Sequence, residues 1–87
     1  MYYTYILYSD KHDRYYIGHC EVLSARLLRH NNKMVTATRN FVPWRIVYYE
    51  EYSTKLEANR RELAIKKMKS RKYIENLIKK FDKEIPG

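Results

Sequence analysis

Residues 2–18 read YYTYILYSDKHDRYYIG, and this stretch decides the fold. Residues 2–8 are aromatic and branched, which favours a β-strand, whereas residues 10–13 are polar and typical of a turn. Residues 14–18 form a second short strand-like run that ends at a glycine. Because the link between the two runs is short, the stretch predicts an antiparallel hairpin.

A helix and a third strand are predicted after the hairpin. Residues 22–30 predict the helix, because three apolar side chains recur there at helical spacing: Leu23, Leu27 and Leu28. Residues 33–43 lack a clean period and are expected to form a loop. Residues 44–49 are rich in aromatic and β-branched side chains and predict the third strand.

Two hydroxyl residues predict the starts of two further helices. Thr54, with Glu57 three residues later, matches a capping box and predicts a long helix over residues 55–69. Ser70 is expected to cap a last helix, whose apolar face would consist of Tyr73, Ile74, Leu77, Ile78 and Phe81.

These segments together predict an α+β fold, with a small three-stranded antiparallel sheet flanked by about three helices. A chain of 87 residues has room for one core, so we expect a single domain over residues 1–82. Residues 83–87 are expected to form a frayed tail.

The charge of the chain is unbalanced, with 18 Lys and Arg against 10 Asp and Glu and a net charge of +8. It also contains 10 tyrosines. A basic chain rich in amphipathic aromatic rings is typical of a protein that contacts nucleic acid, although charge can also serve only solubility. The densest basic run supplies the candidate phosphate contacts, unless it is merely a solvated helix end: Lys67, Lys69, Arg71 and Lys72.

Several classes of protein are excluded by composition. The single cysteine, Cys20, allows neither an internal disulfide nor a zinc site built on several cysteines, and it is expected to be a buried filler. No apolar run approaches the roughly 20 residues that a membrane-spanning helix needs. The N-terminus lacks the pattern of a targeting peptide. We therefore expect a cytoplasmic protein with no membrane partner.

Glu62 is a first candidate for chemistry. It shares one face of the expected long helix with Ala58 and Ile65, and a carboxylate in a partly apolar stripe needs a partner. Lys66, four residues later, is positioned for a salt bridge, which the helix alone favours. The alternative is a metal ligand, because Mg²⁺ is commonly held by one or two carboxylates together with waters and phosphate oxygens.

Further candidates lie on the first helix and on the two hairpin strands. Arg26 and His30 are four residues apart and point the same way; arginine offers a fork of donors to a phosphate, and histidine can move a proton near neutral pH. Tyr5 and Tyr16 lie on the strands, where anchoring of the sheet is the usual role of a tyrosine. His19, beside Gly18, could contact substrate or be a surface residue, and the second is favoured.

Taken in order, these residues resemble the GIY-YIG nuclease superfamily. The second signature motif is intact as Tyr16-Ile17-Gly18, whose glycine lets a backbone or substrate come close. The first is degenerate, because Tyr3-Thr4-Tyr5 stands where Gly-Ile-Tyr is expected and only the last tyrosine matches. Arg26 with His30 and then Glu62 follow in the family's order, and the likeness extends from residue 2 to about residue 81.

The resemblance implies an endonuclease that hydrolyses DNA phosphodiester bonds with one divalent ion, Mg²⁺ or Mn²⁺. Glu62 would bind the ion and Arg26 would stabilise charge on the scissile phosphate. Tyr16, with Tyr5 beside it, would be the general base or orient the water, and His30 would assist proton transfer or hold a tyrosine. Three further residues are supporting candidates: Gly18, Lys66 and Asn76.

Two alternatives remain open from the sequence. The first is a nucleic-acid-binding module of the same fold whose catalysis is weak or absent. The second is a protein-interaction domain whose basic surface only aids solubility. For the nuclease, specificity would come from the domain itself, from a homodimer, or from a separate partner.

Overall fold

The hairpin predicted from residues 2–18 forms two of the three strands of the sheet. β1 (Tyr2–Ser9) and β2 (Arg14–Cys20) pair antiparallel along their whole length, from Ser9 opposite Arg14 to Tyr3 opposite Cys20. The structure is a computed structural model, and it describes residues 1–85 of the chain. The hairpin prediction is therefore confirmed.

The third strand completes the sheet on the other side of β1. β3 (Arg45–Tyr52) pairs antiparallel with β1, so the strand order is β2-β1-β3 and the first strand of the chain is the central one. The pairing is irregular between Ile6 and Leu7. The strand continues to Tyr52, beyond the predicted end at residue 49.

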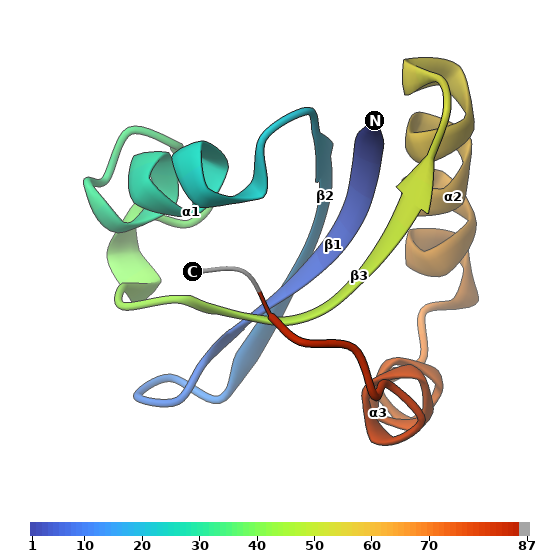
Figure 1. Ribbon diagram of the computed structural model, residues 1–87. Coiled ribbons are helices and arrows are strands. Elements are labelled where there is room, and N and C mark those ends of the chain that lie inside the picture. Colours follow the sequence, from blue (N-terminus) through green and yellow to red (C-terminus); the bar gives the residue numbers. More distant parts are fainter. Residues whose placement is uncertain (86–87) are drawn as a thin grey trace.

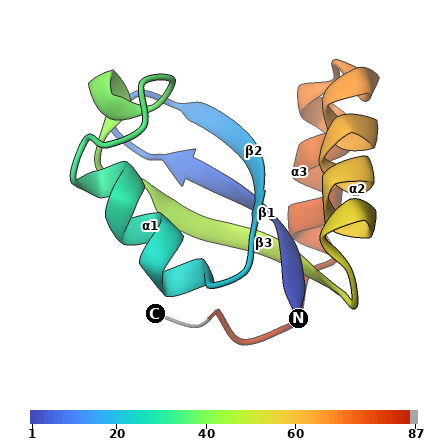
Figure 2. The same ribbon diagram turned by 90° about the horizontal axis from the view of Figure 1, so that it is seen from above.

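Helices cover both faces of this sheet. α1 (Leu23–Asn31) lies on one face, while α2 (Lys55–Met68) and α3 (Arg71–Lys79) lie together on the opposite face (Figures 1 and 2). The segment predicted as a loop over residues 33–43 contains a short 3-10 helix, Arg39–Phe41. The α+β architecture with three helices around a three-stranded antiparallel sheet agrees with the prediction.

Side-chain caps set the starts of α2 and α3. The Thr54 hydroxyl accepts a hydrogen bond from the backbone N–H of Glu57 at 3.2 Å, and the Ser70 hydroxyl accepts one from the N–H of Tyr73 at 3.1 Å. Lys69 adopts a left-handed conformation with φ of 48°, which ends α2 at Met68, one position before the predicted end. Both predicted caps are therefore confirmed.

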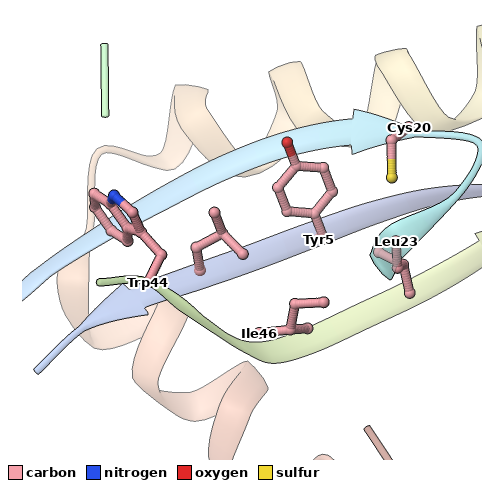
Figure 3. Close-up of a cluster of buried hydrophobic side chains, with 6 residues drawn as sticks. Tyr5, Cys20, Leu23, Trp44 and Ile46 are labelled. Atoms are coloured by element: carbon pink, nitrogen blue, oxygen red, sulfur yellow. The ribbon is translucent and has the colours of Figure 1, made fainter. Parts of the chain in front are cut away.

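Two hydrophobic clusters lie on opposite faces of the sheet, because neighbouring residues of a strand point to opposite sides. The cluster facing α1 contains Tyr5, Leu7, Cys20, Leu23, Trp44 and Ile46 (Figure 3). The cluster facing α2 and α3 contains Ile6, Ile17, Tyr48 and Ile65. Burial raises the pKa of the Cys20 thiol to about 11, which suits a filler and not a nucleophile.

The two terminal helices differ in how well their apolar faces were predicted. The expected face of α3 packs against the second cluster with Tyr73, Ile74, Leu77, Ile78 and Phe81. On α1, however, Leu28 is 62% exposed and does not join the core. It lies five residues after Leu23 and so about 140° around the helix, away from the buried side.

The end of the described chain lies against β3. The Tyr49 hydroxyl donates a hydrogen bond to the carbonyl of Glu84 at 3.2 Å, and the Lys83 ammonium lies 5.6 Å from the centroid of the Tyr49 ring. Of the tail expected over residues 83–87, residues 86 and 87 lie outside the described residues. No helix in the described part of the chain is long and apolar enough to cross a membrane.

Candidate active site

Gly18 makes room for the ring of Tyr5. The two residues are direct partners in the β1–β2 pair. A Cβ atom at position 18 would lie 2.5 Å from the Tyr5 hydroxyl oxygen and 2.6 Å from Cζ, closer than side chains pack. The glycine therefore permits the close approach of the Tyr5 side chain from the neighbouring strand.

A chain of buried hydrogen bonds runs from Tyr5 through His30 to Thr38. The Tyr5 hydroxyl lies 2.9 Å from Nε2 of His30, and Nδ1 of His30 lies 2.7 Å from the Thr38 hydroxyl oxygen. These three side chains are 2%, 1% and 0% exposed. Because Trp44 Nε1 also donates to the Thr38 carbonyl at 3.0 Å, the segment after α1 is fixed over the site.

His30 is held in its neutral form. Burial, and then the positive charges of Arg26 and Arg29, lower its pKa to about 4. The Thr38 hydroxyl donates to the Val35 carbonyl at 3.4 Å, which leaves its oxygen to accept from Nδ1–H of His30. We therefore assign Nε2 as the acceptor of the Tyr5 hydroxyl proton.

Tyr5 keeps its proton at neutral pH. Burial raises its pKa well above the usual range, and the Arg26 guanidinium beside it opposes this rise only in part. A protonated hydroxyl that donates to His30 can position a neighbouring group but cannot serve as a general base. Of the two tyrosines expected near the chemistry, Tyr5 is thus not suited to act as the general base.

Tyr16 has neighbours from α1 and from α2, which lie on opposite faces of the sheet. Its ring packs against His30, with 5.1 Å between the ring centroids, and against Trp44 at 6.4 Å. The ammonium of Lys66, which comes from α2, lies 5.8 Å from the centroid of the same ring. The Tyr16 hydroxyl has no hydrogen-bond partner among residues 1–85, so it is free to bind water or substrate.

The Glu62 carboxylate points toward β2 and contacts two basic side chains, His19 and Lys66. One carboxylate oxygen lies 2.6 Å from Nδ1 of His19, and the other accepts from the Lys66 ammonium at 2.6 Å. The side chain of Glu62 is only 12% exposed. The predicted salt bridge with Lys66 therefore exists, and it occurs at the sheet and not on an outward face of the helix.

The expectation that His19 is a simple surface residue is wrong. Its imidazole contacts the Glu62 carboxylate and is partly buried against α2. The alternation of side chains along β2 could have predicted this burial, because Ile17 and His19 share the face of β2 that is opposite to Tyr16. A long helix that presents Glu62 to this face gives the histidine its partner.

The donor set around Glu62 suits one hard divalent ion. A single carboxylate, with the other positions left to waters and phosphate oxygens, is a usual way to bind Mg²⁺, and a neighbouring imidazole suits Mn²⁺ as well. Within residues 1–85, no three His, Cys, Asp or Glu side chains gather around one point. Lys66 would have to release its carboxylate oxygen for an ion to bind there.

A pocket of about 320 Å³ brings three basic side chains together. Arg26 from α1, His19 from β2 and Lys55 from the first turn of α2 line it, beside Tyr2 and Glu21. His19 thereby connects this pocket with Glu62, and Arg26 connects it with Tyr5 and His30. An anion in the pocket would meet positive charge from both faces of the sheet.

The remaining candidates lie on α2, on α3 and at the turn between these helices. Asn76 is exposed on α3, on the side opposite to the residues that pack on the sheet, so the structure does not bring it to Glu62. Arg71 is engaged by the carboxylates of Asp13 and Glu75. Within residues 1–85 the other three basic candidates are exposed and have no carboxylate partner: Lys67, Lys69 and Lys72.

Comparison with protein families and with solved structures gives a consistent result. The model of the GIY-YIG catalytic domain matches residues 1–76. UPF0213 proteins from two strains of Staphylococcus epidermidis are each 42% identical over 52 residues, a match that covers 59% of this chain and 63% of each relative. The chain thus spans less than two thirds of the length of these relatives.

A solved structure shares both the sequence pattern and the fold. The solution NMR structure of a UPF0213 protein from Bacillus halodurans is 32% identical, with a TM-score of 0.55, and the match covers 91% of this chain and 84% of that one. The family model covers all three strands, α1 and α2. The chain therefore belongs to the GIY-YIG catalytic-domain family, a nuclease superfamily, and its relatives are UPF0213 proteins.

Proposed function

We propose that the chain is a divalent-metal-dependent endonuclease that hydrolyses phosphodiester bonds of DNA. One observation carries the proposal: the basic pocket is lined by Arg26, which lies beside the buried Tyr5, and by His19, which contacts Glu62. A phosphodiester needs positive charge where its transition state gains negative charge, together with a positioned water. The residues around this pocket can supply both.

Arg26 is proposed to bind the scissile phosphate. Its guanidinium lines the pocket, and its planar fork of donors matches two phosphate oxygens. Because negative charge on these oxygens grows in the transition state, a fixed arginine lowers the barrier more than it strengthens substrate binding. Lys55, which also lines the pocket, would hold the phosphate backbone by charge.

Glu62 is proposed to bind one Mg²⁺ or Mn²⁺, and its carboxylate fits such an ion. When bound there, the ion would supply Lewis-acid stabilisation of charge on the phosphoryl oxygens. His19 would hold the carboxylate in place from the sheet. Lys66, which is exposed and flexible, would exchange its contact with Glu62 for one with the substrate.

Tyr16 is proposed to orient the attacking water. A tyrosine hydroxyl can both donate and accept a hydrogen bond, so it can hold a water in one orientation. Tyr5 and His30 are positioning residues that hold the ring of Tyr16 and the pocket wall. Nε2 of the neutral His30 accepts a hydrogen bond from the Tyr5 hydroxyl and fixes this hydroxyl in one orientation.

The test is the nicking of supercoiled plasmid with Mg²⁺, with Mn²⁺ and with EDTA. We expect Arg26→Ala and Glu62→Gln each to lower the nicking rate by about 100-fold or more, because each removes charge stabilisation at the reacting phosphate. Matched controls are Arg60→Ala and Glu51→Gln, which change exposed residues of α2 and β3 and should leave the rate unchanged. Thermal melting of every variant confirms folding.

Two other results would overturn the proposal. Nicking that survives both site substitutions would identify a contaminating nuclease. Absence of nicking, together with DNA binding that weakens steeply with salt, would favour the nucleic-acid-binding module without catalysis. The ion pair between Glu62 and Lys66 favours this second candidate function, because the lysine occupies the carboxylate that an ion would need.

A further inference from the structure

A second hollow lies next to the candidate site, beside β2 and the turn that joins α2 to α3. It has a volume of about 330 Å³, an apolar floor of Ile17, Ile65 and Ile74, and a basic rim of Lys66, Lys69 and Arg71. We refer to it as the β2 groove. Lys66 connects it with the site, because the same ammonium contacts Glu62 and lies over the Tyr16 ring.

The basic residues at the rim are in different states. Arg71 is fixed by Asp13 and Glu75, and its guanidinium carbon lies 4.9 Å from the centroid of the Tyr15 ring, which also lines the groove. Lys69 is exposed and, within residues 1–85, has no carboxylate partner. The rim therefore combines the planar Arg71 guanidinium, which is held by two carboxylates, with Lys69, whose charge no carboxylate of the described residues neutralises.

An apolar hollow with a charged rim matches the two halves of a nucleotide. A nucleobase is flat and gains free energy on apolar and guanidinium surfaces, while its phosphate needs a cation such as Lys69. A base inside a duplex is stacked and paired, so it cannot enter a hollow unless it leaves the helix. The groove is thus complementary to an unpaired nucleotide and not to the outside of an intact duplex.

We propose that the β2 groove binds one unpaired nucleotide of the substrate, adjacent to the phosphate in the site. This inference rests on the proposed nuclease function and specifies its substrate as DNA with a single-stranded or extrahelical nucleotide. The base lies on the floor formed by Ile17 and Ile74, and its phosphate contacts Lys69. Lys66, between the groove and Glu62, contacts the DNA backbone where it passes from one subsite to the other.

The test compares two DNA ligands by fluorescence anisotropy in EDTA, where nothing is cut. One is a blunt duplex, and the other is the same duplex with a single extrahelical 2-aminopurine. We expect the wild type to bind the second about tenfold more tightly, with a change in 2-aminopurine fluorescence. Lys69→Glu should remove this preference, and Lys69→Gln should reduce it.

Lys72→Glu is the matched control, because it reverses the same charge on the outward side of α3, away from the groove. It should weaken both ligands equally and retain the preference between them. Equal binding of the two ligands by the wild type, or equal effects of the substitutions at 69 and 72, would overturn the inference. Loss of plasmid nicking with the preference intact would instead overturn only the catalytic proposal.

Discussion

The two faces of the sheet use the same strand for different purposes. On the face covered by α1, Tyr5 of β1 enters a buried polar chain with His30 and Thr38. On the face covered by α2 and α3, the next residue of β1, Ile6, packs at the centre of an apolar cluster with Ile17. On β1, the buried polar chain and the apolar cluster are thus separated by one position along the strand.

The two faces differ in how sensitive they are to substitution. A buried hydrogen-bond chain is favourable only when every member is paired, and any loss of a partner is expensive. Apolar packing depends on area and tolerates small shifts of position. We therefore expect substitutions in the apolar cluster under α2 and α3 to change stability first, and substitutions in the polar chain under α1 to change activity, pH dependence and stability together.

The largest effect is expected from Ile6→Ala on the apolar face. Ile6 is fully buried, so the cavity should lower the free energy of unfolding by about 2–5 kcal/mol, measured by urea denaturation. Leu28→Ala, which shortens an exposed side chain of α1, should cost less than about 0.5 kcal/mol. Similar losses in the two variants would contradict the assignment of the core.

Acid should act on the polar face through His30. The unfolded chain takes up this proton near pH 6.5 and the folded chain near pH 4, so the unfolded state binds more protons between these values. Stability should therefore fall by on the order of 3 kcal/mol as the pH drops through this window. His30→Gln, compared by urea unfolding at each pH, should show a shallower decline, since it cannot titrate. Equal slopes would show that His30 is not buried in neutral form.

Gly18→Ala is expected to have the smallest effect on stability, about 1–3 kcal/mol, because the Tyr5 ring must move away from the new methyl group. Nicking should nevertheless fall more than the loss of folded protein explains. In a Tyr5→Leu background the same change should cost less, since the clashing hydroxyl and Cζ are absent. Additive losses in this double-mutant cycle would mean that the two residues do not interact.

Local signals in the sequence were sufficient for most of the fold. Hydrogen bonds of Thr54 and Ser70 are made within three residues, so the caps could be predicted without knowledge of the tertiary structure. The salt bridge between Glu62 and Lys66 is likewise a local contact on one helix. Leu28 helped to predict α1 but is exposed, because helical spacing defines a face only approximately and packing decides where that face ends.

The parts of the site that depend on tertiary packing could not be predicted in the same way. Thr38 comes from a segment without a clean period, and it reaches His30 only because this segment folds over α1. His19 gains its carboxylate from α2, many residues later in the chain. Asn76 was assigned from the family resemblance alone, and its position on α3 carried no local constraint that tied it to Glu62.

The central place of β1 also determines the order in which the protein can fold. The β1–β2 hairpin joins residues near in sequence, such as Ser9 and Arg14, and can form early. β3 must instead return across a long connection to pair Tyr8 with Arg45, and such non-local pairing is slow because loop closure comes first. Until the chain beyond residue 45 has been synthesised, one edge of β1 is unpaired and neither cluster is complete. The arrival of β3 therefore completes the cluster under α1, whereas the other cluster also needs Ile65 of α2, so the two faces close one after the other.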